Sequence, residues 1–184
     1  MKMRYVFFPF AIIFLVYLII PGPTSVNDFP SLPNSVKSDL SGDTWQVPNV
    51  VGYFSDNYRK MATSYYKNIF QQKNILFLPP IRLNYPPEFA YTAIKVETQS
   101  TYLEEYLYPL RNSVFVNGLE PFSEDGQRRF WGSTKFEIGD QAFFTKVTLR
   151  FYPSPIWARL VVWVGICLSL VLLWKLGRRI LSGE

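Results

Sequence analysis

Two long apolar runs lie near the ends of the sequence, and most of the polar residues fall between them. The first run, Tyr5–Ile20, contains 16 residues without a charge and is followed by Pro21-Gly22-Pro23. The second run, Ile156–Trp174, contains 19 residues and one charged side chain, Arg159. At ~1.5 Å per residue, helices of these lengths approach the ~30 Å thickness of a hydrocarbon core. The pattern predicts two transmembrane helices that hold the intervening chain at a lipid bilayer.

Basic residues outside the two runs predict the orientation of the chain. Two precede the first run and three follow the second: Lys2, Arg4, Lys175, Arg178 and Arg179. Because cytoplasmic flanks of membrane helices are enriched in Lys and Arg, we expect both termini in the cytoplasm and residues 24–155 outside it. The predicted location is the plasma membrane. The exterior segment has no cysteine and no Asn-x-Ser/Thr sequon, which is typical of a prokaryotic membrane protein.

The N-terminal run has a second interpretation. A basic start followed by an apolar stretch is also the pattern of a secretory signal peptide. Pro21-Gly22-Pro23 is a poor setting for the small-x-small cleavage site that such a peptide requires. An uncleaved anchor is therefore favoured, with the cleaved signal peptide as the alternative.

Two helices are expected in the exterior segment. Apolar residues recur every three or four positions over Pro48–Phe70 and predict one long helix, and Thr101-x-x-Glu104 matches a capping box that would begin a short helix ending near Tyr108. The apolar stripe of the long helix comprises Val51, Phe54, Tyr58, Met61, Tyr65 and Ile69.

Alternating or β-branched stretches predict the strands. The clearest signal is a hairpin from Thr134 to Tyr152 that turns at Gly139-Asp140, and Phe143, Val147, Leu149 and Phe151 should face the core. Asn117-Gly118 is typical of a hairpin turn, with a loop as the alternative. Further strands are predicted at Ile75–Leu78, Glu88–Glu97 and Ser113–Val116. The predicted fold is an α+β exterior domain with a mixed or antiparallel sheet of about four or five strands, one long helix and one short helix.

These elements divide the chain into five predicted segments. They are an N-terminal membrane anchor with a basic cytoplasmic start (1–23), an extended linker (24–47), an extracytoplasmic α+β domain (48–155), a C-terminal transmembrane helix (156–175) and a short basic cytoplasmic tail (176–184). The linker is rich in Pro, Ser, Asn and Asp, and its isolated Phe29, Leu32 and Trp45 could dock on the domain.

The net charge of +5 does not indicate nucleic-acid binding. Residues 24–155 contain 13 Lys and Arg and 13 Asp and Glu, so the domain itself is neutral. The surplus comes from the membrane flanks, whereas a nucleic-acid surface needs basic residues gathered on the folded domain. The expected partners are the lipid bilayer and another membrane protein, with self-association as the alternative.

The residue types restrict the chemistry. The chain has no His, and its one cysteine, Cys167, lies in the second apolar run. Glu104-Glu105 and Glu124-Asp125 are the adjacent carboxylate pairs, but Glu104 is explained as a helix cap and Glu124-Asp125 as a solvated loop. No Gly-rich phosphate loop or metal-ligand spacing is present, so no catalytic residue, cofactor or metal site is predicted.

Three groups of residues are candidates for binding. Arg128, Arg129 and Trp131 could contact an anionic or sugar-like ligand or lipid headgroups, although an ordinary surface loop explains them as well. Small residues at Ala158, Gly165 and Ser169 could let another helix approach closely. The interfacial anchors are expected to be Trp157, Arg159 and Trp174.

Topology and missing catalytic motifs together predict the function. The leading hypothesis is a non-catalytic accessory or assembly subunit of a membrane protein complex, which presents its exterior domain at a fixed height. The first alternative is an envelope ligand-binding or sensor module. The second is a carboxylate-based membrane-bound hydrolase or transferase that acts on surface polymers.

Overall fold

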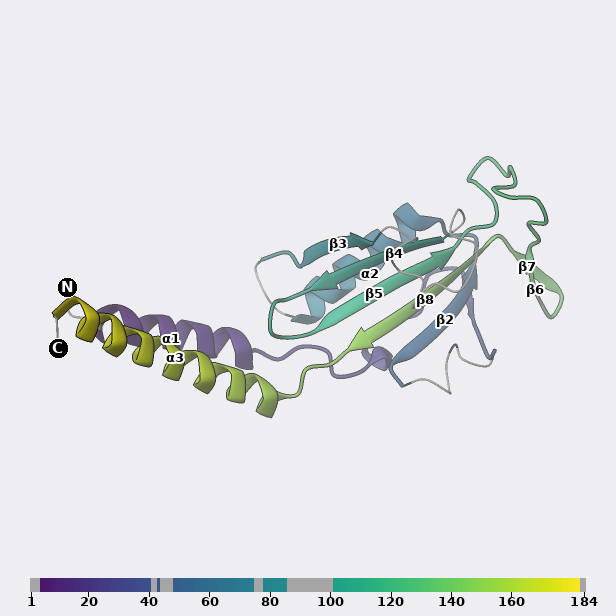
Figure 1. Cartoon of the computed structure of the whole chain (residues 1–184). Coiled ribbons are helices and arrows are strands. Elements are labelled where there is room, and N and C mark those ends of the chain that lie inside the picture. The colour runs from purple at the N-terminus through teal and green to yellow at the C-terminus, as the bar shows by residue number, and fades with distance from the viewer. Residues whose placement is uncertain (1–3, 41–42, 44–47, 75–77, 86–100, 183–184) are drawn as a thin grey trace. The chain divides into compact units, whose positions relative to one another are not determined.

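The computed structural model describes residues 4–40, 43, 48–74, 78–85 and 101–182, and it has an α+β fold with three α-helices (Figure 1). The chain divides into two compact units. One unit combines Met1–Pro21 with Ser154–Glu184, and the other is Gly22–Pro153. The ends of the sequence thus form one unit and the middle forms the other.

The middle unit is built on a six-stranded antiparallel sheet with the order β1-β2-β8-β5-β4-β3. The predicted number of four or five strands was therefore too low. In sheet order the strands are β1 (Ser35–Lys37), β2 (Val50–Ser55), β8 (Thr145–Tyr152), β5 (Ser113–Leu119), β4 (Thr101–Leu107) and β3 (Ile81–Tyr85). A separate two-stranded sheet pairs β6 (Phe136–Ile138) with β7 (Gln141–Phe143).

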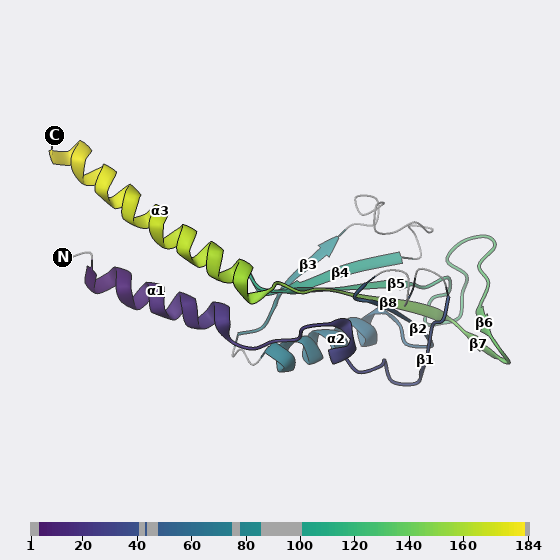
Figure 2. The same cartoon turned by 90° about the horizontal axis from the view of Figure 1, so that it is seen from below.

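Helix α2 (Arg59–Asn74) covers one face of the large sheet (Figure 2). Its Ala62, Tyr66 and Phe70 are fully buried and pack on apolar residues of the central strands. The sheet side of this core includes Val51, Tyr53, Tyr102, Tyr106, Val114, Val116, Val147, Leu149 and Phe151. Alternate residues of the four central strands β2, β8, β5 and β4 therefore form the main core.

The segment before the sheet contributes to the same core. It contains a short 3-10 helix, η1 (Val26–Asp28), and Phe29 and Leu32 are buried. The Phe29 ring lies 5.5 Å from that of Phe151 between centroids and 6.3 Å from that of Phe70. Phe29 and Leu32 pack into the core of the domain as predicted. Trp45 lies outside the described residues.

The single long helix predicted over Pro48–Phe70 is wrong. Its first part is β2, a strand that pairs with both β1 and β8, and its second part is α2. The β-branched and aromatic residues of Val50–Ser55 suit a strand that is buried along its whole length. The predicted apolar stripe continues one helical period across the break between β2 and α2. It therefore misses the fully buried face of α2, which carries Ala62, Tyr66 and Phe70.

The short helix predicted from Thr101 is also wrong, because Thr101–Leu107 is strand β4. It pairs with β3 on one side and β5 on the other. Tyr102, Glu104 and Tyr106 alternate along the strand and are all buried. Pairing of the backbone on both edges outweighs the local capping-box pattern, which Thr101 and Glu104 match by spacing alone.

Asn117-Gly118 does not form a turn. Both residues lie inside β5, where Asn117 is paired with Leu103 and Thr148, and Gly118 with Tyr102 and Val147. The turn at Gly139-Asp140 is confirmed: β6 and β7 flank it, and Gly139 has a φ of 58°. The one long strand predicted up to Tyr152 is instead two strands, β7 and β8, which belong to different sheets. The predicted inward residues Phe143, Val147, Leu149 and Phe151 are all buried. The predicted strands at Glu88–Glu97 and, up to Phe77, at Ile75–Leu78 lie outside the described residues.

The terminal unit contains α1 (Arg4–Ile19) and α3 (Ile156–Ser182). Among the described helices, α3 alone is long and apolar enough to cross a membrane, judged by length and composition. Helix α1 is apolar but has only 16 residues. By these criteria only α3, of the two predicted transmembrane helices, is a candidate to cross a membrane.

Two side-chain hydrogen bonds connect α1 and α3. The indole Nε1 of Trp163 donates to the carbonyl oxygen of Ala11 at 2.9 Å. The Nη1 of Arg159 donates to the carbonyl oxygen of Leu18 at 3.1 Å. Ala11, Leu18 and Arg159 are buried. The bond to Ala11 lies midway along α1, and the bond from Arg159, in the first turn of α3, reaches the C-terminal end of α1.

Candidate functional site

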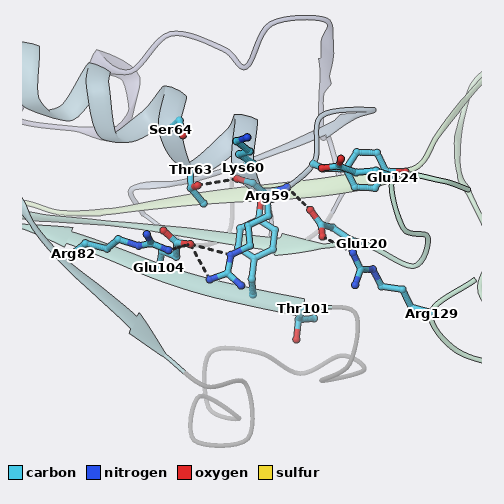
Figure 3. Close-up of a pocket in the computed structure, with 12 residues that line it drawn as sticks. Arg59, Lys60, Thr63, Ser64, Arg82, Thr101, Glu104, Glu120, Glu124 and Arg129 are labelled. Carbon is cyan, nitrogen blue, oxygen red and sulfur yellow. Dashed lines mark hydrogen bonds and ion pairs between the residues drawn. The ribbon is translucent and has the colours of Figure 1, made fainter. Parts of the chain in front are cut away.

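The middle unit has a polar pocket of about 520 Å³ beside the start of α2. Its lining comes from α2, β3, β4 and the residues that follow β5 (Figure 3). The lining residues are Tyr58, Arg59, Lys60, Thr63, Ser64, Arg82, Thr101, Tyr102, Glu104, Glu120, Glu124 and Arg129. This volume falls in the range of small-molecule sites, roughly 300–1,000 Å³.

Charged groups of alternating sign form a row along the pocket. Figure 3 shows them in the order Arg82, Glu104, Arg59, Glu120 and Arg129. The row is assembled from three strands or loops and one helix, because its members are far apart in the sequence. It carries three guanidinium groups and two carboxylates.

Glu104 is the centre of one half of the row. Its Oε1 accepts hydrogen bonds from Arg59 Nε at 2.9 Å and from Arg82 Nη2 at 2.8 Å. Its Oε2 accepts from the hydroxyl of Tyr106 at 2.6 Å. The residue is only 1% exposed, so these three donors replace the water that the carboxylate would otherwise bind.

The protonation of Glu104 follows from this arrangement. Burial alone would raise its pKa, but the Tyr106 hydroxyl and the Arg59 and Arg82 guanidinium groups outweigh burial and hold the pKa below its usual value. Both oxygens are occupied and the group stays ionised. Glu104 is therefore suited to orienting the two arginines rather than to transferring protons.

Glu120 occupies the N-terminus of α2. Its Oε1 accepts a hydrogen bond from the backbone N–H of Arg59, the first residue of the helix, and its Oε2 lies 3.4 Å from Arg129 Nη2. A carboxylate in this position satisfies a helix N–H and complements the helix dipole. Burial nevertheless raises the pKa of Glu120, against the Arg59 N–H and the Arg129 guanidinium.

Tyr102 forms part of the pocket wall between the two carboxylates. Its ring lies across Gly118 on the neighbouring strand, where an added Cβ would come within 2.1 Å of the ring. The Arg59 guanidinium lies 5.4 Å from the ring centroid. The residue is 3% exposed, and its hydroxyl has no hydrogen-bond partner among the described residues.

Two further charged residues line the pocket without an ion pair to any described residue. They are Lys60, which follows Arg59 in the first turn of α2, and Glu124, in the loop after β5. Counting all lining residues gives four cations and three carboxylates, and the pocket has a net charge of +1 when every group is ionised.

The structure places the predicted ligand-contact residues in different settings. Arg129 lines the pocket and reaches Glu120. Arg128 is exposed and does not line the pocket, and Trp131 is 98% exposed. The three residues therefore do not form one described site.

The predicted anchor and helix-contact residues of α3 also lie in different settings. Trp157 and Trp174 are exposed, whereas Arg159 is buried against α1. Ala158 is half-buried, and Gly165 and Ser169 are exposed. An added Cβ at Gly165 would meet nothing within 4 Å, so α1 does not pack on the face of α3 that carries Gly165.

Local patterns in the sequence do not predict most of the pocket. Arg59, Arg82, Tyr102 and Glu120 come from four separate parts of the chain, and the capping-box pattern assigns Glu104 to a helix. The alternation of Tyr102, Glu104 and Tyr106 was the available signal, because it places a carboxylate between two aromatic residues on one face of a strand.

Within the described part of the chain, no group of three His, Cys, Asp or Glu residues could hold a metal ion.

Neither a protein-family model, nor a curated protein, nor a solved structure matches the chain.

Proposed function

We propose that the chain is a non-catalytic accessory or assembly subunit of a membrane protein complex. In this proposal α1 and α3 lie together in the bilayer, both termini are cytoplasmic, and the unit Gly22–Pro153 is extracytoplasmic. The pairing of α1 with α3 is the observation that carries it. Both ends of the domain lead into this helix pair, because the pair is made of the first and the last segments of the chain.

Hydrogen bonding supports the insertion of α1 together with α3. A 16-residue helix covers only ~24 Å and is short for a hydrocarbon core of ~30 Å. In lipid, polar side chains face other helices and require partners. Trp163 Nε1 and Arg159 Nη1 have such partners in the carbonyl oxygens of Ala11 and Leu18, whereas the buried Nε of Arg159 has none among the described residues.

The connection between the domain and α3 supports a role in presenting the domain. Strand β8 ends at Tyr152 and α3 begins at Ile156, so Pro153-Ser154-Pro155 is the whole connection. Two prolines in three residues make this link stiff. A tether of this kind suits a subunit that holds one surface in place for a neighbour.

Two surfaces are available for a neighbouring membrane protein. On α3, Gly165 and Ser169 leave a small-residue face that does not contact α1. On the domain, Trp131 exposes nearly its entire side chain, and exposed aromatic residues are enriched in protein interfaces.

Site-specific photo-cross-linking in the native membrane tests the proposal. A benzophenone amino acid would replace Ser169 or Trp131, and Lys73, an exposed residue of α2, provides the control position. We expect both test positions to cross-link to the same larger membrane protein, which also co-purifies at a fixed ratio, while position 73 does not. Cross-links only to a second copy of this chain, or none at all, would remove the proposal.

A second candidate function, an envelope ligand-binding or sensor module, is favoured by the polar pocket beside α2. The third, a carboxylate-based hydrolase or transferase, gains no support from Glu104, since both of its oxygens already accept hydrogen bonds.

A further inference from the structure

We propose that the pocket beside α2 binds a small hydroxylated anion of the sugar phosphate or sugar acid class. The inference concerns the middle unit alone and does not depend on the proposed role in assembly. It rests on the positive groups of the pocket, their unused donors, the hydroxyl and carboxylate groups of its lining and the size of the cavity.

Positive charge exceeds negative charge where the guanidinium groups meet. Arg59 and Arg82 both donate to one oxygen of Glu104, so a single carboxylate faces two cations. Their side chains remain 40% and 52% exposed. Lys60 adds a third cation that has no ion pair with a described residue. An anionic group of a ligand would complete the charge balance here.

The arginines have donors left to offer a ligand. A guanidinium group has five N–H donors, and Arg82 uses one of them on Glu104 in the hydrogen bonds described above. Arg59 uses Nε on Glu104 and Nη2 on Asn84. Because two bonds orient the Arg59 guanidinium, a phosphate or carboxylate could bind it with less loss of side-chain entropy.

The pocket also offers partners for hydroxyl groups. Thr63, Ser64 and Thr101 line it, and the Glu124 carboxylate has no ion pair with any described residue. Each of these oxygens could accept a hydrogen bond from a ligand hydroxyl group.

The size of the cavity favours an organic molecule over a simple ion. A volume of about 520 Å³ far exceeds that of one inorganic phosphate, and the lining groups are spread over it. Buried ion pairs that only stabilise a fold can often be replaced by apolar residues without loss of stability. The row of charged residues described above instead lines an open pocket. The arrangement therefore fits a ligand that has an anionic group at the arginine end and hydroxyl groups elsewhere.

Isothermal titration calorimetry on the full chain in mild detergent tests the assignment. The probes are glucose 6-phosphate and glucuronate, with glucose and inorganic phosphate as the neutral and sugar-free comparisons. We expect the two anionic sugars to bind. Lys60→Ala and Arg82→Ala should each weaken binding about tenfold, because each removes a charge-assisted hydrogen bond.

Matched variants separate the pocket from the general charge of the domain. Lys67→Ala removes the same charge two turns further along α2, and Arg128→Ala removes an exposed arginine outside the pocket. Both should bind like the wild-type chain, and thermal unfolding would verify that all four variants fold. Equal losses in the test and control variants would overturn the assignment, as would the absence of binding at millimolar probe concentrations.

Two further results bear on the source and class of the ligand. Inorganic phosphate that binds as tightly as glucose 6-phosphate would overturn the assignment to a sugar. Nanodiscs with phosphatidylinositol or phosphatidylcholine provide the lipid comparison. A thermal shift that occurs only with phosphatidylinositol and requires Lys60 and Arg82 would support the same chemistry with a lipid headgroup as its source.

Discussion

Arg59 donates from Nε to Oε1 of Glu104 at 2.9 Å and thereby joins the first residue of α2 to the middle of β4. The same arginine presents its backbone N–H to Glu120 at the end of β5. One residue therefore links the helix to two neighbouring strands. Arg59 thereby connects the elements that line the pocket. Because its side chain contacts Glu104 and its backbone N–H contacts Glu120, each carboxylate can be mutated without removing the other contact.

Glu104→Gln should destabilise the middle unit by about 1–3 kcal/mol. The substitution removes the charge that faces Arg59 and Arg82 in a buried position, but both arginines keep partial contact with water. Chemical denaturation at pH 7 measures the change. Glu124→Gln, which alters a pocket carboxylate without an ion pair to a described residue, should have little effect. An equal loss in both variants would contradict the prediction.

The pH dependence of this contribution follows from the lowered pKa of Glu104. Its stabilising effect is present above the ordinary pKa of a glutamate and is lost as the pH falls through the lowered pKa of the folded state. Denaturation curves between pH 7 and acid should therefore converge for the wild-type chain and Glu104→Gln. A difference that stays constant down to the lowest pH would exclude the ionised carboxylate as its cause.

Glu120→Gln should have the opposite pH dependence. Because burial raises the pKa of Glu120, the folded state binds more protons than the unfolded state between the ordinary and the raised values. The contribution of the group to stability is full below its ordinary pKa and decreases as the pH rises through the raised one. The glutamine variant, whose amide oxygen can still accept from Arg59 N–H, should remove this decrease and be more stable than the wild-type chain at pH 7.

Stability measured across this pH range checks the prediction for Glu120. Glu137→Gln, an exposed residue of β6, provides the control and should follow the wild-type curve. A Glu120→Gln chain whose stability has the same slope against pH as the wild-type chain would show that folding does not raise the pKa of Glu120.

Local signals predicted some elements correctly for a physical reason. The hairpin at Gly139-Asp140 and the inward face of Val147, Leu149 and Phe151 depend on neighbours within a few residues, and such neighbours are visible in one sequence. The same reliance on local pattern produced the wrong helix at Thr101. A threonine and a glutamate three positions apart match a capping box, but pairing with β3 and β5 decides the structure of this segment.

The pocket could not be predicted from local patterns because its contacts are long-range. Arg59 meets Glu104 and Glu120 across 45 and 61 residues of sequence. The order of strands brings them together, and that order was not apparent from the sequence. Glu104 also made strand β4 hard to predict, since a charged residue on a buried face breaks the expected alternation of apolar and polar positions.

Gly118→Ala should destabilise the middle unit by about 1–3 kcal/mol. An added Cβ would come within 2.4 Å of three atoms of the Tyr102 side chain, which is almost fully buried and cannot move aside freely. Repeating the substitution in a Tyr102→Leu background, where the ring is absent, should recover most of the loss. Additive effects in this double-mutant cycle, measured by chemical denaturation, would show that the two residues do not compete for space.

Trp163→Phe should weaken the pairing of α1 with α3 by about 0.6–1.7 kcal/mol. Phenylalanine preserves an aromatic ring between the helices but removes the Nε1 donor that reaches the carbonyl oxygen of Ala11. Trp157→Phe makes the same change at a position that is 67% exposed, so it should leave the pairing intact.

Unfolding of the full chain in micelles by increasing sodium dodecyl sulfate measures the difference between the two tryptophan variants. Energy transfer between dyes placed near the two termini would report separation of the helices. If Trp163→Phe separates them no more readily than Trp157→Phe, the hydrogen bond to Ala11 does not hold the pair. Pairing would then rest on apolar packing and on Arg159, whose Nη1 donates to the carbonyl oxygen of Leu18, the second-last residue of α1.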